Sequence, residues 1–197
     1  DIETQQSLAV DHRALWVNAA LCHNLKEVNS HGKDKWQGDP MEVALAGMGR
    51  RAAGALDGYT RLDEIPFDTD RKRMSVRVDT PAGPMLYCKG ALETVLAVCD
   101  FVQIDAGITP LDNAARTRLL AVQDEMAEAG LRVLAFAHGP TDGGLPAEEH
   151  GLILAGLVGL EDPPRPEVPE AVARCAAAGI RVIMVTGDHP HTAQAIA

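Results

Sequence analysis

Features that mark several protein classes are scarce or missing in this chain of 197 residues. The four cysteines, Cys22, Cys88, Cys99 and Cys175, are widely spaced and form no Cys-x-x-Cys pair. The sequence therefore predicts neither a zinc site nor a disulfide framework, and we expect reduced, cytosolic thiols. The longest strongly apolar run, residues 152–160, falls far short of the roughly 20 residues that a membrane-spanning helix needs. The first residues lack both an initiator Met and the layout of a signal peptide, so we expect a piece of a longer protein.

Positive charge is scarce as well, because 18 basic residues stand against 28 acidic ones and the formal net charge is −10. Nucleic acids and anionic membranes bind proteins through a positive field, so this balance argues against both as partners. The chain contains neither a Gly-x-x-x-x-Gly-Lys-Ser/Thr loop nor a Gly-x-Gly-x-x-Gly loop, the two common phosphate-binding turns. Any anion site must therefore be built by a local cluster of basic side chains.

The hydrophobic pattern is that of a globular α+β protein, with 46% hydrophobic and 23% charged residues. We expect strands over residues 73–78, 85–88, 131–137 and 152–160. We expect helices over residues 7–24 and 92–99, from Asp39-Pro40 onward, and from Thr109-Pro110 to Gly130, with a polar turn over 29–37. After residue 160 we expect a helix over 167–178, a strand over 180–185 and the start of another helix.

Basic side chains gather near the ends of the predicted strands, at Arg71, Lys72, Arg73, Lys89 and Arg132. In an acidic protein such a cluster can concentrate a polyanion such as a nucleoside triphosphate, and Phe67 is available to stack on a base. The alternative is that the three consecutive cations form a solvated strand edge that discourages aggregation. For those three residues taken alone, the second interpretation is favoured.

Other polar residues have a structural interpretation beside a functional one. Asp39 and Glu42 have the spacing of a capping box, and spacing alone favours that role for Glu42. Gly90 is either a turn glycine or a position where a ligand comes close to the backbone. Asp188 follows a predicted strand, where open α/β sheets bind ligands, or it caps the next helix. The two histidines after it form too weak a pattern to predict a metal site.

Six short motifs occur in order along residues 38–188. They are Gly38-Asp39-Pro40-Met41-Glu42-Val43-Ala44-Leu45, Phe67-x-x-Asp70-Arg71-Lys72-Arg73-Met74-Ser75, Lys89-Gly90-Ala91, Leu131-Arg132-Val133-Leu134-Ala135, Asp162-Pro163-Pro164-Arg165 and Thr186-Gly187-Asp188. In this order they resemble P-type cation-transporting ATPases, most of all the type II branch that contains calcium pumps and their bacterial relatives. Each motif alone is weak, but six in register make a chance match negligible.

The resemblance implies a domain organisation. Residues 1–160 would form the nucleotide-binding domain, an antiparallel sheet flanked by helices, and residues 161–197 the hinge and the partial α/β start of the phosphorylation domain. ATP or ADP would be the ligand, and the chain would be a cytoplasmic domain of an integral membrane pump. Its partners would be the remaining phosphorylation domain, the actuator domain and the transmembrane domain. The transported ion stays unspecified, because its ligands would lie in membrane helices.

The resemblance also assigns residues to the nucleotide site. They are Glu42, Phe67, Lys72, Lys89, Gly90 and Arg132. Glu42 and Phe67 would contact adenine, with the phenyl ring stacking on the base. The two lysines and Gly90 would line the pocket and the phosphate path, and Arg132 would bind phosphate oxygens.

The remaining motifs concern the complete enzyme. Asp162 and Arg165 would mark the hinge, and Thr186 and Asp188 would lie near the γ-phosphate and Mg²⁺. The nucleophile of the family is the first Asp of an Asp-Lys-Thr-Gly-Thr sequence, which is absent here, as are the downstream Mg²⁺-binding aspartates. Thr69 stands where some relatives carry a basic residue, which would weaken phosphate binding. We therefore expect this chain to bind nucleotide without turnover.

Two other functions fit less well. A non-catalytic interaction or regulatory domain would keep the fold and lose the ligand. Such a domain should have lost some of Glu42, Phe67, Lys72 and Lys89, and all four are present. A small haloacid-dehalogenase-type phosphatase is suggested by the Thr-Gly-Asp motif, but no aspartyl nucleophile precedes it at a strand end. We therefore predict an ATP-binding part of a P-type cation pump.

Overall fold

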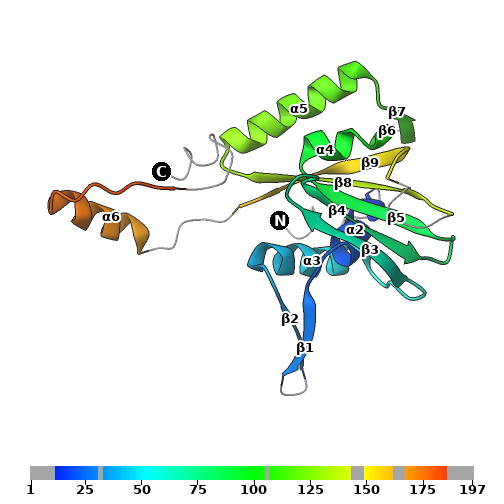
Figure 1. Cartoon of the computed structure of the whole chain (residues 1–197), viewed down its shortest axis with the longest axis horizontal. Coiled ribbons are helices and arrows are strands. Elements are labelled where there is room, and N and C mark those ends of the chain that lie inside the picture. Colours follow the sequence, from blue (N-terminus) through cyan, green and yellow to red (C-terminus); the bar gives the residue numbers. More distant parts are fainter. Residues whose placement is uncertain (1–11, 31–32, 105–106, 143–148, 162–166, 186–197) are drawn as a thin grey trace.

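The computed structural model describes residues 12–30, 33–104, 107–142, 149–161 and 167–185. A seven-stranded sheet lies at its centre, in the order β3-β4-β5-β8-β9-β6-β7 (Figure 1). Neighbouring strands are antiparallel, except that β6 and β9 run parallel. The predicted α+β fold with an antiparallel sheet flanked by helices is confirmed. The strands are β3 (Thr60–Asp68), β4 (Arg73–Asp79), β5 (Met85–Gly90), β6 (Cys99–Ile104), β7 (Gly107–Pro110), β8 (Arg132–Pro140) and β9 (Leu152–Leu160).

Helices cover both faces of this sheet. α2 (Arg13–Leu21) and α3 (Pro40–Ala53) lie on one face, and α4 (Leu92–Leu96) and α5 (Asn113–Glu128) lie on the other (Figure 1). Residues of β8 alternate between the two layers: Phe136 packs with Leu15 and Leu45, whereas Ala135 and Ala137 pack in the cluster that contains α4. The core therefore has one apolar layer on each side of the sheet.

β4 and β5 agree with the strands predicted over residues 73–78 and 85–88, and they form an antiparallel hairpin that carries part of the site. Met74, Val76 and Val78 are buried on one face of β4, as their alternation predicted. β5 continues past the predicted end at residue 88 and includes Lys89 and Gly90. These two residues therefore lie within the sheet and not in a turn after it.

The strands at both edges of the sheet and a separate hairpin were not predicted. β1 (Lys26–Ser30) and β2 (Lys33–Gln37) form a separate hairpin, so the predicted polar turn over 29–37 is wrong. β3 is an edge strand that contains Pro66, and most of its residues are exposed. β6 and β7 form a hairpin at the opposite edge of the sheet. Because these strands meet solvent, they lack the apolar alternation from which strands are predicted.

Some helices are shorter than predicted, because an unpredicted strand includes the adjacent residues. α5 begins at Asn113 and not at Thr109-Pro110, which belong to β7. Asp112 caps this helix by accepting a hydrogen bond from the N–H of Ala115 at 2.7 Å. α4 ends at Leu96, before β6, and α2 ends at Leu21, while residues 7–11 of that predicted helix lie outside the described residues. In the described parts of the chain, no helix has both the length and the apolar character that crossing a membrane requires.

The spacing of apolar residues in the sequence predicts a buried stripe of Met41, Leu45, Met48, Ala52 and Leu56, and the observed buried face of α3 differs from it. Gly49 packs so closely on α2 that a Cβ there would lie 2.6 Å from the backbone nitrogen of Ala20. This contact turns the small residues of the helix toward the core. The buried residues are Leu45, Ala46, Gly49 and Ala53. Met41, Met48, Ala52 and Leu56 of the predicted stripe are only half-buried.

The last described segment stands away from the sheet. α6 (Val168–Ala177) lies apart from the other elements in Figure 1, and none of its residues is buried. The strand predicted over 180–185 is wrong, because residues 181–185 form no strand. Ile183 and Val185 are 72% and 91% exposed. The other predicted residues of this region lie outside the described residues: Asp162, Arg165, Thr186 and Asp188.

Candidate functional site

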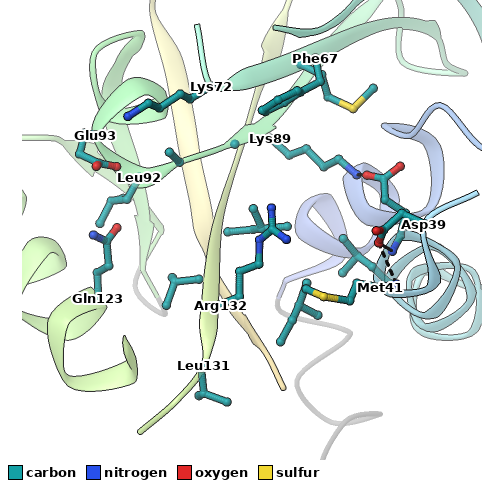
Figure 2. Close-up of a pocket in the computed structure, with 18 of the residues that line it drawn as sticks. Asp39, Met41, Phe67, Lys72, Lys89, Leu92, Glu93, Gln123, Leu131 and Arg132 are labelled. Atoms are coloured by element: carbon teal, nitrogen blue, oxygen red, sulfur yellow. Dashed lines mark hydrogen bonds and ion pairs between the residues drawn. The ribbon is translucent and has the colours of Figure 1, made fainter. Parts of the chain in front are cut away.

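A pocket of about 660 Å³ opens at the end of the sheet where β5 stops and β8 begins (Figure 2). This volume lies within the range of roughly 300–1,000 Å³ that is usual for small-molecule sites. α3 forms one wall, and the C-terminal half of α5 reaches the opposite wall through Gln123 and Ala127. All the residues that were predicted for the nucleotide site line it: Glu42, Phe67, Lys72, Lys89, Gly90 and Arg132.

An ion pair between Glu42 and Lys89 lies in the wall next to α3. The Nζ of Lys89 donates to Oε1 of Glu42, and the backbone N–H of Asn24 approaches Oε2 at 3.5 Å. The Lys89 side chain is only 5% exposed and that of Glu42 is 22% exposed. A buried ammonium ion is stable only with a counterion, which Glu42 supplies here.

This arrangement corrects the sequence interpretation of Glu42. Asp39 caps α3 as predicted, since its Oδ1 accepts from the N–H groups of Met41 at 2.9 Å and Glu42 at 3.2 Å. The carboxylate of Glu42 does not complete the capping box, because it binds Lys89 across the pocket. The residue is therefore part of the pocket and not a second cap.

Phe67 lies at the rim of the pocket. It belongs to edge strand β3, and its pairing with β4 is irregular between Ile65 and Asp68. Such an irregularity redirects side chains from the regular alternation. Phe67 is 54% exposed and lines the pocket (Figure 2). A large exposed aromatic ring at a pocket rim is available to stack on a flat ligand.

The turn between β3 and β4 presents Lys72. Lys72 has φ 50°, a left-handed conformation that residues other than glycine rarely adopt. Its N–H donates to the carbonyl of Asp68 at 2.7 Å, and its own carbonyl accepts from the N–H of Ala91 at 2.9 Å. The Asp68 carboxylate accepts from the N–H groups of Arg71 and Asp70, which lower the pKa of Asp68. The turn is thus held by hydrogen bonds at both ends.

Gly90 is required by its own backbone neighbours. A Cβ at this position would lie 2.4 Å from the carbonyl oxygen of Lys72 and 2.6 Å from the Cα of Arg73. Neither sequence interpretation describes this contact, since Gly90 lies in β5 and the chain that approaches it is the start of β4. Any larger residue would displace the turn that carries Lys72.

The predicted basic cluster divides into two groups. Arg71 and Arg73 do not line the pocket, because each donates to the buried carboxylate of Glu149. Burial opposes ionisation of Glu149, but hydrogen bonds from Ser75, Arg73 and Arg71 outweigh it and lower the pKa of this carboxyl. Glu149 belongs to none of the motifs in the sequence, so the sequence analysis did not identify it as a partner of these arginines.

Lys72 and Arg132 are the cations that remain on the pocket. Arg132 begins β8, its side chain is exposed, and Figure 2 shows the guanidinium directed into the pocket. Among the described residues, neither side chain has a carboxylate within ion-pair distance. Also within the described ranges, no three His, Cys, Asp or Glu side chains are grouped so that they could hold a metal ion. The charged and aromatic lining of the pocket therefore comprises one ion pair, one aromatic ring, the two cations of Lys72 and Arg132, and the carboxylates of Asp39 and Glu93.

Comparisons with known proteins identify the family of this chain. The family model described as P-type ATPase, cytoplasmic domain N, matches residues 11–167. The chain is 38% identical over 181 residues to Calcium-transporting ATPase 2, plasma membrane-type, of Arabidopsis thaliana, a match that covers 86% of this chain and 18% of that protein.

Two bacterial proteins match to a similar degree. Cation-transporting ATPase pma1 of Synechocystis sp. is 41% identical over 178 residues, which are 85% of this chain and 19% of the relative. Calcium-transporting ATPase 1 of Bacillus cereus is 35% identical over 192 residues, which are 94% of this chain and 21% of the relative. The chain thus spans about a fifth of the length of these relatives. With the predicted fold present and most of the chain matched, this protein belongs to the P-type ATPase family, in the part described as cytoplasmic domain N.

Proposed function

We propose that this chain binds ATP and ADP in the pocket at the end of its sheet. One observation carries the proposal: residues from α3, β3, the turn before β4, β5 and β8 meet around a single pocket. They are far apart in sequence, and they are the residues that the family resemblance assigns to a nucleotide. A pocket with an aromatic rim and cations beyond it matches a ligand that has a flat base at one end and phosphates at the other.

The two halves of the nucleotide are assigned to different residues. Phe67 stacks on adenine and Glu42 contacts the same base from α3, which lies on that side of the pocket. Lys72 and Arg132 bind phosphate oxygens, because neither is held by a described carboxylate. Lys89 and Gly90 line the path between the two ends. Arg71 and Arg73 are left out of the site because Glu149 binds them.

The proposal extends to the longer protein to which the relatives point. Relatives named calcium-transporting and cation-transporting ATPases suggest a pump that couples ATP hydrolysis to cation transport through an aspartyl-phosphate. In that pump residues 1–160 are the cytoplasmic nucleotide-binding domain, and residues 161–197 begin the phosphorylation domain, with Asp162 and Arg165 at the hinge. Mg²⁺ would neutralise phosphate charge there, near Thr186 and Asp188. This chain alone binds nucleotide without hydrolysing it, because the Asp-Lys-Thr-Gly-Thr sequence with the nucleophile is absent.

Calorimetric titration of the chain with ATP, ADP and adenosine tests the proposal. We expect similar, modest affinities for ATP and ADP with little dependence on Mg²⁺. Loss of a base stack costs on the order of 1–3 kcal/mol, so Phe67→Ala should weaken both nucleotides about tenfold or more. Phe101→Ala is the matched control, since this ring is also exposed but does not line the pocket. Equal affinities for wild type and Phe67→Ala would remove the stacking assignment.

The phosphate contacts are tested by comparing ATP with adenosine. Charge-assisted hydrogen bonds are worth roughly 1.5–3 kcal/mol, so Lys72→Met and Arg132→Ala should each weaken ATP more than adenosine. Arg118→Ala, an exposed arginine of α5 outside the pocket, is the control for the loss of a positive charge. Equal losses for ATP and adenosine would show that these residues shape the pocket without binding phosphate. Absence of binding by the wild-type chain would favour the interaction-domain alternative.

A further inference from the structure

The side chain of Glu149 makes several polar contacts that no motif in the sequence indicates. It lies between β8 and β9, and its side chain is only 8% exposed. Oε1 accepts from the hydroxyl of Ser75 at 2.5 Å and from Arg71, and Oε2 accepts from Arg73 at 2.9 Å. One buried carboxylate therefore binds the residues on both sides of Lys72.

These contacts act on a strained turn. The left-handed backbone of Lys72 persists only if the surrounding structure holds it. The hydrogen bonds of Lys72 to Asp68 and Ala91 hold its backbone, while Glu149 holds the two flanking side chains. Arg73 is fixed further by its NH1, which donates to the carbonyl of Thr94 at 3.4 Å.

The contacts also decide which of three consecutive cations faces the pocket. Arg71 and Arg73 are turned to Glu149 and do not line the pocket, whereas Lys72 does (Figure 2). Two guanidinium groups can make bidentate bonds to a carboxylate or to phosphate, so either could compete for the position of Lys72 if it were released. Glu149 provides the competing carboxylate that keeps them away.

We propose that Glu149 is a positioning residue, which places Lys72 for the phosphates of the bound nucleotide by holding Arg71 and Arg73. The inference rests on the proposed nucleotide site and extends it to a residue outside the pocket. The lowered pKa of Glu149 agrees with this role, since the carboxylate stays ionised at neutral pH. Its function is exerted through Lys72 and not through contact with the ligand.

The test is a double-mutant cycle on the full chain, with ATP and adenosine affinities measured by calorimetry. Glu149→Gln should lower the affinity for ATP about five- to tenfold, and by no more than Lys72→Met lowers it. The affinity for adenosine should change less than twofold. In the Lys72→Met chain, Glu149→Gln should change ATP affinity less than twofold. Glu170→Gln, which removes the same charge from the exposed Arg174 pair of α6, should leave both affinities unchanged.

Other results would overturn the inference. An unchanged or higher ATP affinity in Glu149→Gln would assign Glu149 to stability or to charge neutralisation alone. An equal loss with and without Lys72 would show that the effect does not pass through this lysine. If Glu149→Gln does not fold, Arg71→Gln, which removes one of the three bonds, is measured in the same cycle with the same criteria. Failure of the wild-type chain to bind ATP would instead refute the proposed function, and this inference with it.

Discussion

Breaking the Glu42–Lys89 pair should have unequal effects on stability, depending on which partner is removed. Lys89→Met leaves the Glu42 carboxylate with the distant N–H of Asn24, but that side chain is 22% exposed and reaches water. We expect a loss of about 1–3 kcal/mol of unfolding free energy. Glu42→Met leaves the ammonium of Lys89 without its counterion at 5% exposure. The expected loss there is about 3–5 kcal/mol, the usual cost of breaking a buried pair.

The double variant Lys89→Met/Glu42→Met should regain most of the lost stability. Two apolar side chains of similar length replace the pair, and such replacements are often neutral. A residual loss of about 1 kcal/mol is expected, because an acidic residue in the first turn of α3 interacts favourably with the helix dipole. The coupling energy of the cycle should therefore be at least about 3 kcal/mol.

Urea denaturation followed by circular dichroism measures all four chains. Glu170→Gln, which breaks an exposed ion pair, is the reference variant, and its expected loss of unfolding free energy is less than about 1 kcal/mol. A coupling energy below about 1 kcal/mol would mean that water screens the Glu42–Lys89 pair as it does surface pairs. The assumption that Lys89 is a buried charge held by Glu42 would then be wrong.

Three further predictions follow from the same geometry. Burial, together with the nearby Arg61, lowers the pKa of His23 from 6.5 to about 4, so between these values the unfolded chain binds a proton that the folded chain does not. Unfolding free energy should fall as the pH drops through this window, and His23→Gln should flatten that part of the urea-measured profile. Incubation with Mg²⁺, ATP and a transported cation should give no hydroxylamine-sensitive phosphoenzyme, and trapping one would overturn the assignment of roles. Truncation after Leu160 should leave ATP affinity and most of the melting temperature unchanged, and loss of either would move the domain boundary.

The parts of the fold that could be predicted are those where one face of an element is buried. β4 alternates Met74, Val76 and Val78 against polar neighbours, and β9 is apolar throughout, so both were found from the sequence. β3 and the β6–β7 hairpin lie at the two ends of the sheet, where neighbours on one side are missing and side chains meet solvent. Their backbone pairing depends on distant strands, which a local pattern does not contain.

The pocket residues could be predicted from the sequence, but their partners could not. Motif order pointed to all the proposed nucleotide residues, and the structure brings them to one pocket. The partners of these residues were not predictable, because Glu42 meets Lys89 and Arg71 meets Glu149 only after β5 and the β8–β9 segment have packed. The positions of basic residues near strand ends suggested a cluster of cations, whereas the separation of that cluster into bound arginines and a pocket lysine arises from tertiary contacts.

Residues beyond β9 show why an apolar pattern is insufficient for a strand. Residues 180–185 have the composition of a buried strand, yet Ile183 and Val185 are exposed, and α6 likewise exposes Val168 and Val172. A strand forms only where another strand satisfies its backbone groups, and the described sheet ends at β3 and β7, which this segment does not join. The relatives are about five times longer than the matched region, which leaves room for the strands that would pair with it. The exposed apolar side chains of α6 and of residues 180–185 agree with the proposed domain boundary near Leu160, beyond which we propose that residues of a longer protein complete the segment.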